Sequence, residues 1–313
     1  MSELYLGIDT SNYTSSCAVY NAENDTFLSL KKLLPVEHGN LGLRQSDAVF
    51  HHTKNLPPLL CELFQDISDS PDAIGVSYAP RDCDGSYMPC FSVGEGYASV
   101  ISAAFTTPIH RFSHQAGHVA AALWSSGQKN LLEKEFIAFH FSGGTTDMLH
   151  VTPDNNKIFN IDTISASLDL KAGQAVDRAG VMLGLQFPAG KEIDKLACQS
   201  TKEFRTKPFL KNGSCSFSGL ENKCRTMKNN NEADCDIAKY CIDYITDAVR
   251  LMTEHALLEF GDLPLIYAGG VMSNSIIRNK ISTEFGGHFA SPDYSSDNAA
   301  GTSYLAYIKE QRK

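Results

Sequence analysis

Short apolar runs and longer amphipathic stretches alternate along the chain. The apolar runs predict strands at 4–8, 15–20, 73–78, 107–112, 136–141, 148–151 and 265–271. Between them, apolar positions that recur every three or four residues predict helices, most clearly over 236–260. A further helix is expected to begin at the Pro57–Pro58 pair. Strands and helices in this order predict an α/β protein with two similar lobes around a cleft.

The two lobes are expected to divide the chain near its middle. Residues 1–130 would form the N-terminal lobe and residues 131–297 the C-terminal lobe, with a terminal helix over 298–313 packing back on the first. One arrangement occurs twice, at residue 9 and at residue 142: a strand, a turn rich in small and hydroxyl residues, and a second strand. Many ordinary hairpins carry such turns, but they also offer N–H groups and hydroxyls to phosphate. Two of them facing each other would hold a nucleotide, and the Gly269–Gly270 pair lets a phosphate or flat ligand approach the backbone.

The composition excludes several classes of protein. The chain has 313 residues, of which 42 % are hydrophobic and 20 % are charged, as in an ordinary globular protein. No apolar run is long enough to cross a membrane, and the first residues lack the basic start of a signal peptide. The nine cysteines are odd in number and form no C-x-x-C pair. We therefore expect reduced thiols, a cytoplasmic location and no membrane partner.

The charge is distributed unevenly. A net charge of −9 argues against a protein that coats itself with nucleic acid unaided. Residues 195–228 nevertheless carry eight Lys or Arg against Glu203 and Glu221. This stretch is either a solvated face or a patch for nucleic acid or another acidic partner.

Two histidines four residues apart, His114 and His118, start a predicted helix. This spacing places both imidazoles on one face, where they could bind one metal ion, although partly buried or capping histidines would give the same pattern. In the zinc peptidase pattern H-E-x-x-H the residue after the first histidine is the general base, but Gln115 stands there and cannot accept a proton. Peptidase activity of that kind is therefore not expected.

Seven motifs occur in the order of a known family, at 6–11, His114-x-x-x-His118, 141–146, 173–177, 187–190, 217–220 and 268–274, and the match extends to residues 297–300. Together they resemble the universal tRNA threonylcarbamoyladenosine synthase subunit, formerly called O-sialoglycoprotein endopeptidase or glycoprotease. That family belongs to the actin-like, sugar-kinase and Hsp70 ATPase superfamily. The resemblance implies this fold, with two lobes around a nucleotide cleft.

The resemblance also implies a site. One divalent metal ion, iron or zinc, would be held by His114, His118 and Asp297. The nucleotide, as ATP, AMP or threonylcarbamoyl-adenylate, would be contacted by His140, Phe141, Ser142, Gly143, Gly144, Asp177, Gly190, Asp194 and Asn274, to which the sequence adds Gly269 and Gly270. Asp9 and Ser11, at the end of the first strand, are the candidate catalytic residues.

The implied reaction moves a threonylcarbamoyl group from its adenylate to the exocyclic amine of an adenosine beside the tRNA anticodon. The metal would polarise the donor and AMP would leave, so no covalent nucleophile is needed. Family members act on tRNA with accessory proteins, including an inactive paralogue and a small ATPase, and a homodimer is possible.

The chain departs from the family pattern at the predicted cleft. Tyr13 and Thr14 replace an acidic pair in the first turn, and Thr145 replaces a histidine. A divergent paralogue that binds nucleotide and metal, but acts on another acceptor or serves as a scaffold, is therefore the main alternative. A sugar kinase is a weaker one, because kinases hold magnesium through carboxylates and phosphates instead of two histidines.

Overall fold

The computed structural model describes residues 3–11, 13–35, 43–67, 69–294 and 298–313. The chain divides into two compact units. Unit 1 comprises residues 1–124, 154–159 and 296–313, and unit 2 comprises residues 125–153 and 160–295. The C-terminal helix therefore belongs to the unit that is built mainly from the first 124 residues.

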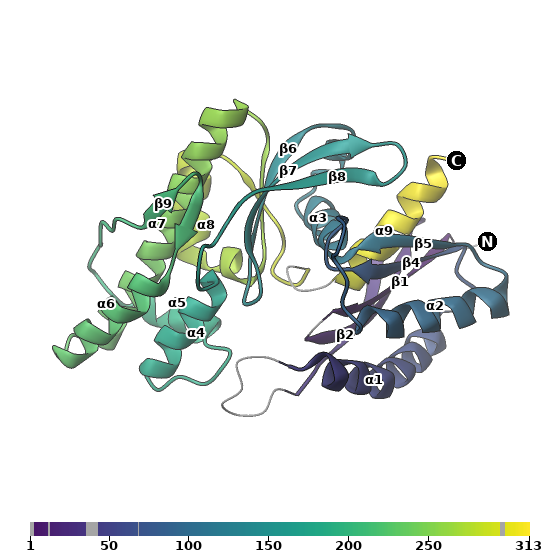
Figure 1. The fold of residues 1–313 in the computed structure, drawn as a ribbon, viewed down its shortest axis with the longest axis horizontal. Helices are drawn as coiled ribbons and strands as arrows, with labels where there is room; N and C mark the ends of the chain where they lie inside the picture. The colour runs from purple at the N-terminus through teal and green to yellow at the C-terminus, as the bar shows by residue number, and fades with distance from the viewer. Residues whose placement is uncertain (1–2, 12, 36–42, 68, 295–297) are drawn as a thin grey trace. The chain divides into compact units, whose positions relative to one another are not determined.

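Unit 1 contains a five-stranded sheet in the order β3-β2-β1-β4-β5 (Figure 1). The strands are β1 (Leu4–Ser11), β2 (Thr14–Asn21), β3 (Thr26–Leu33), β4 (Ala73–Ala79) and β5 (Ile109–Ser113). The first three pair antiparallel, whereas β1, β4 and β5 run parallel. The helices are α1 (Gln45–Gln65), α2 (Phe91–Phe105), α3 (His114–Ser125) and α9 (Asn298–Gln311).

The two faces of this sheet are covered by different helices. Leu6 and Ile8 of β1 pack in a hydrophobic core with side chains of α1 and α2. Gly7 points to the opposite face, because side chains alternate along a strand. A Cβ on Gly7 would lie only 1.9 Å from the carbonyl oxygen of Ala299 in α9. Glycine at this position thus allows the C-terminal helix to lie directly on the strand.

Unit 2 contains a second five-stranded sheet, in the order β12-β11-β6-β7-β8 (Figure 1). Its strands are β6 (Phe136–Phe141), β7 (Thr146–Asp154), β8 (Ile158–Ala166), β11 (Leu265–Ala268) and β12 (His288–Phe289), and a small sheet pairs β9 (Phe209–Lys211) with β10 (Ser214–Ser216). The helices are α4 (Ala172–Met182), α5 (Gly190–Ala197), α6 (Ser218–Asn229), α7 (Asp234–Phe260) and α8 (Ser275–Phe285), with 3-10 turns η1 (Lys129–Glu133) and η2 (Gly270–Ser273).

The two sheets repeat one plan, as the sequence predicted. In each, a strand pairs antiparallel with the next strand of the chain on one side and parallel with a later strand on the other. β1 holds that place in unit 1 and β6 in unit 2. The α/β prediction is confirmed. The third strand along the chain in each sheet, β3 and β8, was not predicted, because most of its side chains are partly or fully exposed and it lacks a long apolar run.

One predicted helix boundary was wrong. α1 begins at Gln45, so Pro57 and Pro58 lie inside the helix and do not start it. Neither proline can donate a backbone hydrogen bond, which ordinarily disfavours such positions. Leu56, Leu60 and Leu63 are buried on the sheet-facing side of the same turns, and their packing keeps this stretch helical. No helix in the described part of the chain has the length and apolar character needed to span a bilayer.

Candidate functional site

In unit 1, helices α3 and α9 approach each other through two glycines. A Cβ on Gly301 would lie 1.8 Å from the carbonyl oxygen of Gly117, and a Cβ on Gly117 would lie 3.2 Å from the carbonyl oxygen of Asn298. The missing side chains allow backbone contact between the helices. As a result, the start of α9 lies beside the first turn of α3, where both predicted metal-binding histidines stand.

His114 and His118 lie together on α3, as the four-residue spacing predicts. Their ring centroids are 4.6 Å apart and the rings are inclined by 70°. Both side chains are partly exposed, while Gln115 between them is buried. The pair therefore presents two imidazoles on one face of the helix, at its first turn.

His114 is held by residues from two other elements. Its Nδ1 lies 3.0 Å from Oδ1 of Asp9, at the end of β1. Because an ionised carboxylate can only accept, Nδ1 donates this hydrogen bond, and Nε2 is the ring nitrogen that could bind a ligand. The amide nitrogen of Asn298 lies 2.9 Å from Nε2 and also contacts Nδ1. A hydrogen bond from one ring nitrogen to a carboxylate is the usual way in which a metal-binding histidine is oriented.

Asp9 is almost completely buried, with 1 % of its surface exposed. Burial alone would raise the pKa of this carboxyl. The charge of His114 and the hydrogen bonds from His114 and from the Ser11 N–H, which lies 3.3 Å from Oδ2, outweigh burial and lower the pKa. Asp9 is therefore a buried carboxylate whose chief partner is His114. Ser11 contributes its backbone to this cluster.

The residues around the histidine pair fit a metal ion in part. Asp297, the third predicted ligand, lies outside the described residues, and among the residues that are described no group of three His, Cys, Asp or Glu side chains could hold a metal. Oδ1 of Asn298 is buried and accepts no hydrogen bond from the described chain. Rotation of this amide would bring an oxygen to the histidines. Two imidazoles and a nearby amide oxygen suit a divalent cation.

In unit 2, the predicted phosphate turn connects β6 and β7. The Ser142 hydroxyl accepts hydrogen bonds from the N–H groups of Gly144 at 3.3 Å and Thr145 at 3.0 Å. The start of α4 packs against this turn so closely that a Cβ on Gly173 would lie 2.6 Å from the Gly143 nitrogen. A Cβ on Gly143 or Gly144 would meet nothing within 4 Å. The turn thus has a fixed shape and an open side from which a ligand could approach its backbone.

The ends of β6 and β11 also lie together. Gly269 has φ +96° and packs against β6, because a Cβ there would lie 2.2 Å from the carbonyl oxygen of Phe141 and 3.0 Å from the His140 ring. Gly270 has open space beside its Cα. The Phe141 side chain is fully buried in the core, so only its backbone can contact a ligand. The structure thus brings His140, Phe141 and Gly269 to one place.

Asp177, Asp194 and Asn274 have structural partners of their own. Oδ1 of Asp177 accepts the Ala189 N–H at 2.8 Å, and burial raises the pKa of this carboxyl despite that hydrogen bond. Asp194 accepts both the N–H and the hydroxyl of Ser275, at 3.1 and 2.9 Å.

Asn274 caps α8 by accepting the next two free N–H groups of the helix, at 3.0 and 3.1 Å. Its oxygen is therefore occupied within the protein. Gly190 begins α5, and a Cβ there would meet nothing within 4 Å.

Two residues that help to build these candidate sites were not predicted from the sequence. Asn298, directly after the predicted ligand Asp297, touches His114. Asp169 fixes the entrance to α6 by accepting the N–H groups of Phe217 at 2.8 Å and Ser218 at 3.1 Å. Burial raises the pKa of Asp169, but these hydrogen bonds and that of the Ser216 hydroxyl outweigh it and lower the pKa well below its usual range. Asp169 lies about fifty residues before the helix that it caps, so the local sequence pattern around either one does not indicate this contact.

Comparison with known proteins identifies the family. Residues 39–304 match the model of the family described as TsaD, tRNA N6-adenosine threonylcarbamoyltransferase. The chain is 26 % identical to the tRNA N6-adenosine threonylcarbamoyltransferase of Buchnera aphidicola, over 97 % of this chain and 92 % of that protein.

Two solved structures share the fold at low identity. The component A of (R)-2-hydroxyglutaryl-CoA dehydratase from Acidaminococcus fermentans is 15 % identical, covers 99 % of both chains and has a TM-score of 0.60. A ROK family glucokinase from Streptomyces griseus, solved with glucose and AMPPNP, is 10 % identical, covers 97 % of this chain and 99 % of its own, and has a TM-score of 0.52. These confirm the actin-like ATPase and sugar-kinase fold.

Proposed function

Because the chain belongs to the tRNA N6-adenosine threonylcarbamoyltransferase family, we propose that it transfers a threonylcarbamoyl group from its adenylate to an adenosine of tRNA. The adenosine amine would attack the carbamoyl carbon and lose a proton, the bond from that carbon to the phosphate oxygen would break, and AMP would leave. The structural observation that carries the proposal is the contact between His114 and the buried Asp9. It holds the ring of His114 through Nδ1, so that Nε2 is the nitrogen that could bind an ion.

His114, His118 and Asp297 would hold a divalent ion, iron or zinc. Such an ion supplies a Lewis acid for the carbonyl or phosphate oxygen of the donor. Asp9 would act by fixing the ring of His114, because its carboxylate accepts a hydrogen bond from Nδ1–H and prevents the ring from turning. Ser11 would support Asp9 through its backbone N–H.

The donor's nucleotide would be bound by unit 2. The open backbone at Gly143, Gly144 and Gly270 suits a phosphate, because no side chain obstructs its approach. Asp177 keeps a second carboxylate oxygen for a ribose hydroxyl, while Asp194 and Asn274 would shape the site by holding α5 and the start of α8. His140 would line the site beside Gly269.

A complete reaction tests this function. Purified protein would be combined with unmodified tRNA, a source of threonylcarbamoyl-adenylate, and the accessory subunits of the family, an inactive paralogue and a small ATPase. Nucleosides from the digested tRNA would be analysed by mass spectrometry. We expect threonylcarbamoyladenosine with the natural chain, and none with His114→Ala, which should also lose bound metal in elemental analysis. Absence of product from the complete natural reaction would refute the proposal.

A different acceptor is the second candidate, favoured by one observation. Tyr13 is 40 % exposed in the turn between β1 and β2, where the family pattern has an acidic residue. A phenol there can neither balance a cation nor accept a proton at neutral pH. If this chain fails to replace the genuine enzyme in cells that lack it, while it still binds AMP and metal, the tRNA acceptor is excluded and this candidate stands.

A further inference from the structure

An extended segment of unit 2, residues 203–211, has side chains that alternate between the protein and solvent. Phe204, Thr206, Pro208 and Leu210 are partly or fully buried, whereas all five odd-numbered residues are exposed. This two-residue period is that of a strand. Its last three residues form β9, which pairs with β10.

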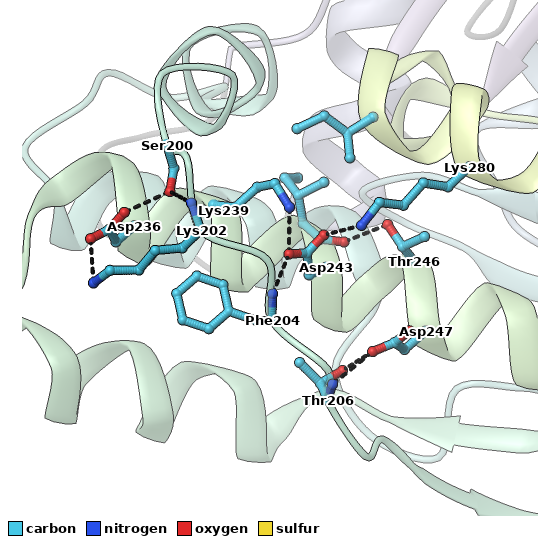
Figure 2. A network of polar contacts seen from close by, with 12 residues as sticks. Ser200, Lys202, Phe204, Thr206, Asp236, Lys239, Asp243, Thr246, Asp247 and Lys280 are labelled. Carbon is cyan, nitrogen blue, oxygen red and sulfur yellow. Dashed lines mark hydrogen bonds and ion pairs between the residues drawn. The ribbon is translucent and has the colours of Figure 1, made fainter.

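Three carboxylates of α7 hold this segment and the residues before it (Figure 2). Asp236 accepts the Ser200 hydroxyl at 2.6 Å and pairs with Lys202 at 2.7 Å. Asp243 accepts the N–H of Phe204 at 3.1 Å. These acids stand seven residues apart and share one face of the helix.

The third carboxylate secures the next inward residue. Asp247 accepts both the N–H and the hydroxyl of Thr206, at 2.8 and 2.6 Å. The Phe204 ring packs edge-on against Tyr240, with centroids 5.4 Å apart. The inward side is therefore anchored at successive even-numbered positions, and the direction of the outward side chains follows from that anchoring.

The outward row from residue 205 is basic with one aromatic: Arg205, Lys207, Phe209 and Lys211. Of the eight cations in residues 195–228, four are paired with nearby carboxylates. The three cations of the row form no ion pair within the described residues. Phe209 is 57 % exposed. At about 3.3 Å per residue, the row is about 20 Å long.

We propose that this row, Arg205 to Lys211, binds a single-stranded stretch of RNA, with phosphates at the three cations and a base stacked on Phe209. Cations that follow a backbone, interleaved with an aromatic ring, are how proteins hold single strands without reading sequence. The chain as a whole has a net charge of −9, but this row of unpaired cations is locally positive and offers a polyanion a site. Naming this RNA as tRNA rests on the proposed function. Glu203 marks the end of the row, because its charge would repel phosphate.

The test uses the full-length chain and a fluorescein-labelled RNA stem–loop with a single-stranded loop, measured by anisotropy over a range of KCl concentrations. Each phosphate contact adds about 0.7 to the salt slope for a single strand, or about fivefold in affinity at 0.1 M relative to 1 M salt. The triple variant Arg205→Ala, Lys207→Ala, Lys211→Ala should therefore bind about 100-fold more weakly at 0.1 M, with a slope lower by about 2. Phe209→Ala should lose about tenfold in affinity with an unchanged slope.

Matched controls remove the same number of cations, and one aromatic ring, elsewhere on the surface. Lys32, Lys54 and Lys134 are exposed outside the segment, and Phe50 is 54 % exposed on α1. The triple Lys→Ala control and Phe50→Ala should each change the affinity by less than threefold. All the substituted side chains are exposed, so the melting temperatures of the variants should stay within about 2 °C of the natural chain.

Two results would overturn the proposal: no RNA binding by the natural chain, or equal losses in the row variant and its control. Threonylcarbamoyl transfer, measured separately, distinguishes the two hypotheses. If the natural chain transfers the group but the row variant binds RNA normally, only the row is refuted. If the natural chain binds RNA through the row yet transfers nothing in the complete reaction, only the proposed function is refuted.

Discussion

Asp243 of α7 offers the sharpest test of how unit 2 is held together. Its side chain is 1 % exposed and lies 2.5 Å from Nζ of Lys239, whose side chain is 9 % exposed (Figure 2). It also accepts hydrogen bonds from Lys280 at 2.9 Å and from the Phe204 N–H at 3.1 Å. Burial lowers the pKa of Lys280, but Asp243 outweighs burial and raises it.

The change Asp243→Ala removes the common partner of all three donors. Lys239 is left as a buried cation without its carboxylate, and breaking a buried ion pair in this way costs about 3–5 kcal/mol. We expect a loss of about 4 kcal/mol, which is a large part of the 5–15 kcal/mol that stabilises a typical protein. The paired change Asp243→Leu with Lys239→Met removes both charges and should recover most of it.

Hydrogen exchange followed by mass spectrometry measures this locally. A loss of about 4 kcal/mol corresponds to about 1000-fold faster exchange for the slowest amides of α7. Glu254→Ala is the control, because it breaks a pair on the same helix, with Arg250 at 2.6 Å, whose side chains are 46 % and 33 % exposed. That change should cost about 0.3–0.5 kcal/mol. Equal effects of the two substitutions would refute the reasoning.

Three further predictions concern the site and its frame. Asp9→Asn should weaken zinc binding about 10–100-fold by calorimetry, because the amide no longer fixes His114; unchanged affinity would contradict this. Asp169→Asn should lower the melting temperature at pH 7. Since the folded pKa of Asp169 is lowered, the difference should be complete above about pH 4 and shrink as the pH falls through the folded value; a difference independent of pH would argue against it. Gly7→Ala should prevent unit 1 from folding, which circular dichroism would show as lost helix and strand signal. Gly96→Ala, with open space around it, should leave the protein's stability unchanged or raise it.

The sequence predicted the elements whose packing is local. The 3.6-residue period over 236–260 lies within α7, and the strand–turn–strand repeat matches both sheets. The Pro57–Pro58 boundary was wrong because the packing of neighbouring leucines is stronger than the local preference of proline. Such packing is not visible in a short stretch of sequence.

The site was predicted as a set of residues, but the contacts within it were not. Spacing alone brings His114 and His118 together, whereas the partnership of His114 with Asp9 joins β1 to α3 and depends on the whole sheet of unit 1. Asn274 and Asp194 were expected to contact a nucleotide, and the structure shows both engaged in hydrogen bonds inside the protein. The fold decides which side chains accept the free N–H groups at the start of a helix.

The position of α9 has a consequence for how the protein is made. This helix covers the glycine face of β1, yet its residues are translated long after those of the strand. All of the residues of unit 2 emerge before it. During synthesis one face of the first sheet must therefore stay uncovered until α9 has been made, so unit 1, whose first strands are made before any of unit 2, can complete its fold only after the whole of unit 2 has been translated.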